Sequence, residues 1–286
     1  MATTIYPIII NGSNLVPSTN NNTYQYFFPS SIQLEPSSKI ALASINMFYS
    51  WYNISTAYNN NKFNIIWATN IGTTTYNLTI PDGYYTVAQL NTYLDSFLIQ
   101  NGLYLIDNNG KYIYYLEIQE NPNVYGIQLN SFPIPNLLPA GWSNPAAMTF
   151  PAIATTPQFV ILNNNFQQWT GVNQGIYPSP SQATTYSKVS DFTPQVTPIQ
   201  SVLMTCSLVN NAYANPTSLL YSFNTSNTAF GGLITSSPNE YIFVNVQQGL
   251  YSDITIRFSD QSFNPISIRD TNIVINLLVL SENKDF

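Results

Sequence analysis

The chain has 286 residues, which suffices for one large β domain or two ordinary ones, and 44% of them are hydrophobic, which is ample for a core. Only 7% are charged, against roughly 25% in an average soluble protein, so amides and hydroxyls must cover most of the surface. The absence of histidine excludes Ser-His-Asp and Cys-His nucleophile systems and imidazole-ligated metal sites. A net charge of −6 without any Lys/Arg cluster argues against a direct nucleic-acid partner.

Strand patterns dominate the chain, because β-branched and aromatic residues cluster in short runs bounded by Asn, Gly, Pro and Ser. In the run Ile254 to Phe258 the alternation places three apolar side chains on one face and Thr255 and Arg257 on the other. These patterns predict an all-β protein. The predicted strands cover residues 5–10, 24–28, 39–49, 63–68, 73–80, 103–106, 112–119, 124–129, 158–162, 201–209, 219–223, 241–246, 254–258 and 272–280, with a hairpin turn at 108–110.

A single helix is predicted from Val87 to Gln100. Thr86 is a suitable N-cap residue, Gln89 completes a capping box, and Asn101-Gly102 provides a stop signal. Its apolar residues recur every three or four positions, so we expect one face to cover a sheet or its edge without a chemical role. That face consists of Val87, Leu90, Leu94 and Phe97.

The segment 131–200 is rich in proline, which predicts long irregular loops. We therefore expect one domain over residues 1–286, with 131–200 as irregular loops or a small insertion within it. The predicted fold class is all-β: a single jelly-roll β-sandwich with one short helix and long loops or an inserted β region.

No residue is predicted to be catalytic, and no cofactor or metal is expected. Cys206 lies in an apolar run, where a buried small side chain is the expected role. Two carboxylate pairs, Glu117/Glu120 and Asp253/Asp260, allow a glycosidase hypothesis. Solvent-facing strand positions explain the first pair, and turn positions that hydrogen-bond their own backbone explain the second.

Trp142 and Trp169 lie in aromatic-bearing loops and could stack on a sugar ring or contact a partner. They motivate an alternative function, a carbohydrate-binding jelly-roll module used for host attachment. Aromatic residues in β proteins also fill sheets and subunit contacts, so both interpretations stay open.

Three segments together resemble the single jelly-roll minor capsid or penton proteins of double-jelly-roll viruses, which include virophages, polinton-like viruses and nucleocytoplasmic large DNA viruses. The first is Thr79 to Thr86 with the following helix, which is similar to that family's strand, glycine-tyrosine turn and short helix. The second, Phe166 to Ser179, resembles its central loop motif, and the third, Asp253 to Val279, resembles its closing hairpin. In the last turn Ser262-Phe263-Asn264 replaces the family's usual glycine.

The resemblance implies a structural virion protein: a penton subunit at the fivefold vertices of an icosahedral capsid. The partners implied are four further copies in a homopentamer, the major capsid protein and other minor capsid proteins. The scarcity of charge fits such a role, since unpaired charge in subunit contacts costs roughly several kcal/mol. We expect no membrane span, because no run of 18 apolar residues occurs, and a virion location after synthesis in the host cell without a signal peptide.

Overall fold

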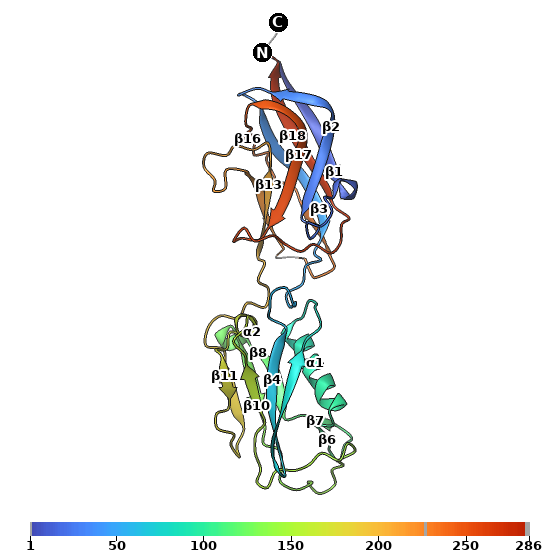
Figure 1. Cartoon of the computed structure of the whole chain (residues 1–286), viewed down its shortest axis with the longest axis vertical. Coiled ribbons are helices and arrows are strands. Elements are labelled where there is room, and N and C mark those ends of the chain that lie inside the picture. Colours follow the sequence, from blue (N-terminus) through green and yellow to red (C-terminus); the bar gives the residue numbers. More distant parts are fainter. Residues whose placement is uncertain (1, 226–227, 284–286) are drawn as a thin grey trace. The chain divides into compact units, whose positions relative to one another are not determined.

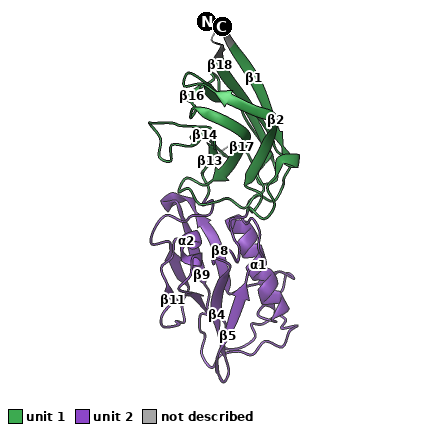
Figure 2. Ribbon diagram, turned by 45° about the horizontal axis from the view of Figure 1, so that its top comes forward, with its two compact units in different colours: residues 1–51, 199–286 green, residues 52–198 purple. Residues whose placement is uncertain are grey.

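The computed structural model describes residues 2–225 and 228–283, and these divide into two compact units (Figures 1 and 2). Unit 1 comprises residues 1–51 and 199–286, and unit 2 comprises residues 52–198. This division differs from the expected single domain with an insertion or loops at 131–200, because most of that segment belongs with residues 52–130. The reason is a shared core: side chains from Ile54 to Val172 form one buried hydrophobic cluster.

Unit 1 is a jelly roll whose strands are distributed over two antiparallel sheets (Figure 1). Successive strands mostly alternate between the sheets, so the order in each sheet is far from the chain order, as in two Greek keys. Among the described residues the first sheet has the order β1 (Ala2–Asn11), β18 (Val274–Asn283), β3 (Lys39–Phe48) and β15 (Leu233–Ser236), with β16 (Val244–Asn245) also on β3. The second has the order β14 (Leu219–Asn224), β13 (Ser201–Cys206), β17 (Gly249–Ser259) and β2 (Thr23–Leu34).

The core of unit 1 lies between these sheets and follows from the period of two in its strands. In β17 Ile254, Ile256 and Phe258 are buried, whereas Arg257 is exposed, as the alternation predicted. Tyr24 of β2 is fully buried and meets Phe258 edge to face, with ring centroids 6.1 Å apart. Burial, and to a smaller extent Asp270, raises the pKa of Tyr24 to about 12. Cys206 is also buried in this core, which confirms the structural role expected of it.

Unit 2 lies in sequence between β3 and β13, and its described residues form two larger sheets, a two-stranded sheet and two α-helices (Figure 2). One sheet has the order β11 (Gly175–Tyr177), β10 (Gln158–Ile161), β4 (Lys62–Thr69) and β5 (Gly72–Thr79). The other has the order β12 (Tyr186–Val189), β9 (Gly126–Ser131) and β8 (Leu116–Asn121). β6 (Leu105–Ile106) and β7 (Tyr112–Ile113) form the predicted hairpin, and two short 3₁₀ turns occupy Gly12–Asn14 in unit 1 and Pro122–Val124 in unit 2.

The helix α1 (Val87–Gln100) begins and ends as predicted. Thr86 Oγ1 accepts a hydrogen bond from the Gln89 backbone N–H, and the Gln89 side chain accepts one from the Thr86 N–H. Its buried face differs by one residue from the prediction, because Leu98 is buried and Phe97 is only partly so. A second helix, α2 (Phe166–Thr170), was not predicted, since its five residues are too few to show a helical period.

Candidate functional site

The strands β1 and β2 are the uncharged edges of the two jelly-roll sheets. β1 pairs only with β18, and β2 pairs only with β17, among the strands of the described chain. Residues 1–34 contain no charged side chain, although charges on edge strands are a common protection against association. Pro7 lies in β1, and the register of β2 breaks between Phe27 and Ile32. Proline has no N–H, and a register break bends its strand. The outer edges of β1 and β2 therefore lack a continuous row of free N–H and C=O groups, and another molecule would meet mainly their side chains.

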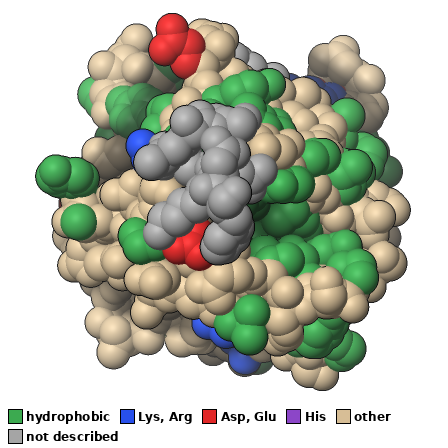
Figure 3. All heavy atoms as spheres, turned by 90° about the horizontal axis from the view of Figure 1, so that it is seen from above, with side chains coloured by type: hydrophobic (Ala, Val, Ile, Leu, Met, Phe, Trp, Pro, Cys, Tyr) green, Lys and Arg blue, Asp and Glu red, His purple; other side chains and the backbone are tan. Residues whose placement is uncertain are grey.

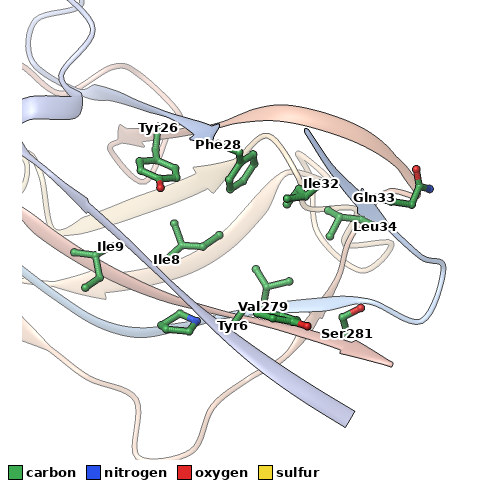
Figure 4. A pocket seen from close by; sticks show the side chains of 11 residues that line it. Tyr6, Ile8, Ile9, Tyr26, Phe28, Ile32, Gln33, Leu34, Val279 and Ser281 are labelled. Carbon is green, nitrogen blue, oxygen red and sulfur yellow. The ribbon is translucent and has the colours of Figure 1, made fainter. Parts of the chain in front are cut away.

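A largely apolar pocket of about 670 Å³ opens between these two edges, within unit 1. Figure 4 shows Ile8 near its centre, with Tyr26 and Phe28 on one side and Val279 on another. Ile8 and Val279 are buried, whereas Tyr6 is 49% exposed at the rim. The pocket is lined by Tyr6, Pro7, Ile8, Ile9, Tyr26, Phe28, Ile32, Gln33, Leu34, Val279 and Ser281.

The lining contains no carboxylate, imidazole, thiol or basic side chain, so its chemistry is mainly apolar. What it can do is bury an apolar group, which is favourable by about 25 cal/mol per Å² of apolar surface removed from water. In the face seen in Figure 3, hydrophobic and uncharged polar side chains cover most of the surface, and charged ones are few. Apolar surface of this kind, bordered by uncharged polar groups, is typical of interaction sites in proteins.

The two tryptophans predicted as sugar or partner contacts occupy different environments in unit 2. Trp169 is 1% exposed and stacks parallel to Phe166, with ring centroids 6.2 Å apart. The ring of Trp169 is enclosed in the core, so this structure leaves no face of it open to a sugar or a partner. Trp142 is partly buried against the same core, and its role as a contact stays a prediction.

The carboxylate pairs also occupy structural positions. Glu117 Oε2 accepts a hydrogen bond from Asn130 Nδ2 at 2.8 Å within the sheet of β8 and β9. Asp260 caps the turn after β17, accepting from the backbone N–H of Ser262 at 2.8 Å and of Asn264 at 2.9 Å, as predicted. Asp253, expected in a turn before the strand, instead lies inside β17, whose N-terminal end extends to Gly249.

The carboxylate of Asp253 accepts a hydrogen bond from Gln25 Nε2 of the neighbouring strand β2 at 2.9 Å. The early apolar residues of β17 are sparse, which is why the alternation did not reveal this part of the strand. Among the described residues, no group of three or more carboxylate, thiol or imidazole side chains is close enough to hold a metal ion. No described helix is long and apolar enough to cross a membrane.

The three sequence segments that carry the family resemblance include the helices α1 and α2 and parts of β17 and β18, together with the turns that join them to neighbouring strands. Asp82 Oδ1 accepts hydrogen bonds from Thr56, and the backbone of Gly83 pairs with Ile54. Gly171 follows α2 with φ of +69°, and a Cβ there would lie 2.2 Å from the Phe192 carbonyl oxygen, so only glycine fits. In the last segment Phe263 takes a φ of +63°, the left-handed conformation that glycine would accept more readily.

Comparison with solved structures finds several similar chains, among them two from viruses. The mavirus penton protein aligns over 98% of this chain and 99% of its own, with 10% sequence identity and a TM-score of 0.44. A chain of the Sputnik virophage aligns over 98% of this chain and 97% of its own, with 12% identity and a TM-score of 0.36. No family model and no curated protein matches the sequence.

The lining residues within 5–10, 24–28 and 272–280 were predicted as strand residues, and none was predicted as a site. Four lining residues lay outside the predicted strands: Ile32, Gln33, Leu34 and Ser281. The sequence signal for the lining residues of β1 and β2 was present, because residues 1–34 combine aromatic and aliphatic side chains with a complete lack of charge. The pocket itself could not be located from sequence, since its walls come from β1, β2 and the distant β18.

Proposed function

We propose that this protein is a structural virion protein, a penton subunit that forms a cyclic homopentamer and packs against neighbouring capsomers in the shell. The observation that carries the proposal is the apolar, uncharged edge of the jelly roll with its pocket between β1 and β2. Such an edge is a liability for a protein that stays a monomer and an asset for one that assembles. The resemblance of the sequence motifs to minor capsid proteins supports the same role.

The occupant we propose for the pocket is a second copy of this chain. Two copies of a chain with net charge −6 repel each other least where neither presents a charge, and the β1/β2 edge is such a surface. A pocket on one copy that receives a different surface of the next is a heterologous contact, which closes into a ring when the rotation allows it. The proposed role includes no catalysis, and the virion is the proposed location.

Size-exclusion chromatography with multi-angle light scattering tests the proposal. We expect a species of five times the single-chain mass. Tyr6→Glu places a charge at the rim of the pocket and is expected to weaken association by about tenfold or more, since an unpaired charge buried in a contact is costly. Tyr213→Glu is the matched control, because Tyr213 is fully exposed in unit 1 and does not line the pocket.

A strictly monomeric protein at high concentration that is also absent from purified particles would overturn the proposed function. If Tyr6→Glu and Tyr213→Glu associated equally strongly, the pocket would not be part of the contact between copies. Circular dichroism checks that each variant is folded. Folding is expected because Tyr6 is 49% exposed and Tyr213 is fully exposed.

A further inference from the structure

A second hollow in unit 1, of about 490 Å³, is polar and lies on the outer face of the sheet that contains β17 and β2. One wall is the loop 16–22 that precedes β2, and the floor includes Thr255 and Arg257 of β17. Except for Val16 and Pro265, its side chains carry hydroxyl, amide or guanidinium groups. The full lining is Val16, Ser18, Thr19, Asn20, Asn22, Thr23, Gln25, Thr255, Arg257 and Pro265.

Arg257 is the only charged side chain of this lining, and its guanidinium is unpaired. Within residues 2–225 and 228–283, no hydrogen bond or ion pair to the Arg257 side chain is present. A smaller hollow of about 210 Å³ adjoins the same Thr255 and Arg257, so the guanidinium borders open space on two sides. Lys39, Lys62 and Lys111 likewise form no ion pair with a described carboxylate, so Arg257 is set apart by its place in the hollow and not by its lack of a partner.

The carboxylates nearest along β17 do not pair with Arg257. Asp253, four residues before Arg257, accepts hydrogen bonds from two lining residues of the hollow, Gln25 Nε2 at 2.9 Å and Thr255 Oγ1 at 3.4 Å. Asp260, three residues after it, accepts the backbone N–H groups of its own turn. The positive charge of Arg257 is therefore left available to a ligand.

The loop wall is fixed before any ligand arrives. Asn21 Nδ2 donates to the Ile268 carbonyl oxygen at 2.8 Å, and Asn22 Nδ2 donates to the Ile266 carbonyl oxygen at 2.9 Å. Ser18, Asn20 and Asn21 all have positive φ angles, between 51° and 63°, a conformation that asparagine accepts more readily than most residues other than glycine. The loop therefore keeps this shape through its own sequence and its hydrogen bonds to Ile266 and Ile268.

We propose that this hollow, named here the Arg257 hollow, binds a saccharide that carries one oxyanion, either a carboxylate or a sulfate ester. A guanidinium binds such planar or tetrahedral oxyanions with paired hydrogen bonds. The surrounding hydroxyl and amide groups both donate and accept, as the hydroxyl groups of a sugar require. The volume lies within the roughly 300–1,000 Å³ of small-molecule sites.

The single positive charge decides between anionic ligands. Nucleic acids and other polyphosphates need grouped cations, and Arg257 stands alone in the hollow. The lining also contains no aromatic ring on which a base could stack. A monoanionic sugar matches both the charge and the hydroxyl-rich lining, and this binding role is independent of ring formation.

Isothermal titration calorimetry with sialyllactose, a sulfated disaccharide and neutral lactose tests the proposal on the full chain. We expect one of the two anionic sugars to bind, which separates carboxylate from sulfate recognition, and lactose to bind about tenfold or more weakly. Arg257→Gln is expected to reduce the affinity by a similar factor, and Arg257→Lys by less. Binding should also weaken as salt concentration rises.

Lys39→Gln is the matched control, because it removes an exposed cation from the same unit outside the hollow. Equal binding of lactose and the anionic sugars, no binding of any of the three, or an unchanged affinity in Arg257→Gln would overturn the proposal. The sugar affinity is measured separately on the assembled fraction and on the single-chain fraction. A failure to bind sugar can then be distinguished from a failure to form pentamers. Arg257 is exposed, so its replacement should leave the fold intact, which the unfolding temperature checks.

Discussion

Asn91 of α1 accepts a hydrogen bond through its Oδ1 from the backbone N–H of Ile118 in β8, at 2.7 Å. β8 pairs with β9 and with no other strand in the described chain, so its opposite edge would leave this N–H without a strand partner. Asn91 Nδ2 in turn donates to Asp95 Oδ2, one helical turn further along, at 3.2 Å. The helix therefore closes the edge of the sheet with a side chain, in addition to burying its apolar face.

We predict that Asn91→Ala destabilises unit 2 by about 1–3 kcal/mol, because the part-buried Ile118 N–H loses its acceptor. The free energy of unfolding in urea measures the effect. Ser96→Ala is the control, since Ser96 is exposed and bonds only within the helix. Equal stability of the two variants would show that the hydrogen bond to β8 contributes nothing.

The Asp95 carboxyl predicts a pH dependence of stability. Burial, and then the nearby charge of Glu117, raises its pKa from 3.8 to about 6. Between these values the folded protein binds more protons at Asp95 than the unfolded chain does, so stability falls as the pH rises through this window. Tyr114 also lies near this carboxyl, whose charge contributes to raising the tyrosine pKa.

Asp95→Asn is expected to flatten this dependence and to stabilise the protein at pH 8 by about 1–2 kcal/mol, allowing for solvent screening of a half-buried group. Unfolding in urea at pH 4.5, 6 and 8 measures it. Glu117→Gln should flatten the curve less, because it removes the smaller cause and leaves burial in place. A loss of stability between pH 4 and 6 that persists in Asp95→Asn would assign it to another group.

The Cys206 thiol provides a probe of unit 1. It is 1% exposed, and burial raises its pKa to about 12, so both access and thiolate formation are suppressed in the folded protein. We predict that a disulfide reagent at pH 8 labels the native chain only through unfolding, whereas the denatured chain reacts at once. Labelling as fast as that of a free thiol under native conditions would contradict the buried position.

Local signals in the sequence were sufficient where the structure itself is local. The capping residues Thr86 and Gln89 located the start of α1, and Asn108 to Gly110 located the hairpin turn. The strands β11, β12 and β15 were not predicted, because each is short and has at most two consecutive apolar residues, unlike the run Phe159 to Leu162 that revealed β10. β15, for example, is defined instead by its pairing with β3.

The candidate sites also combine features that the local sequence predicted with features that only the folded chain brings together. The alternation in β17 predicted that Arg257 faces outward, but only the fold brings the loop 16–22 beside it to form a hollow. Trp142 and Trp169 have similar sequence surroundings of Gly, Asn and Thr or Ser, so the sequence could not show that α2 turns Trp169 into the core. Burial of a single aromatic ring is decided by the packing around it.

The contrast between these two tryptophans gives a last prediction. Trp169→Ala should destabilise unit 2 by about 3–5 kcal/mol, because a fully enclosed ring stacked on Phe166 is replaced by a cavity. Trp142→Ala should cost clearly less, since the Trp142 ring is only partly buried. The free energy of unfolding in urea separates the two variants, and a similar cost for both would contradict their different burial.

Trp142→Ala is expected to stay folded, so the same variant on a glycan array also tests whether Trp142 contacts a sugar. If Trp142→Ala lost binding and Arg257→Gln kept it, sugar recognition would belong to unit 2 and not to the Arg257 hollow.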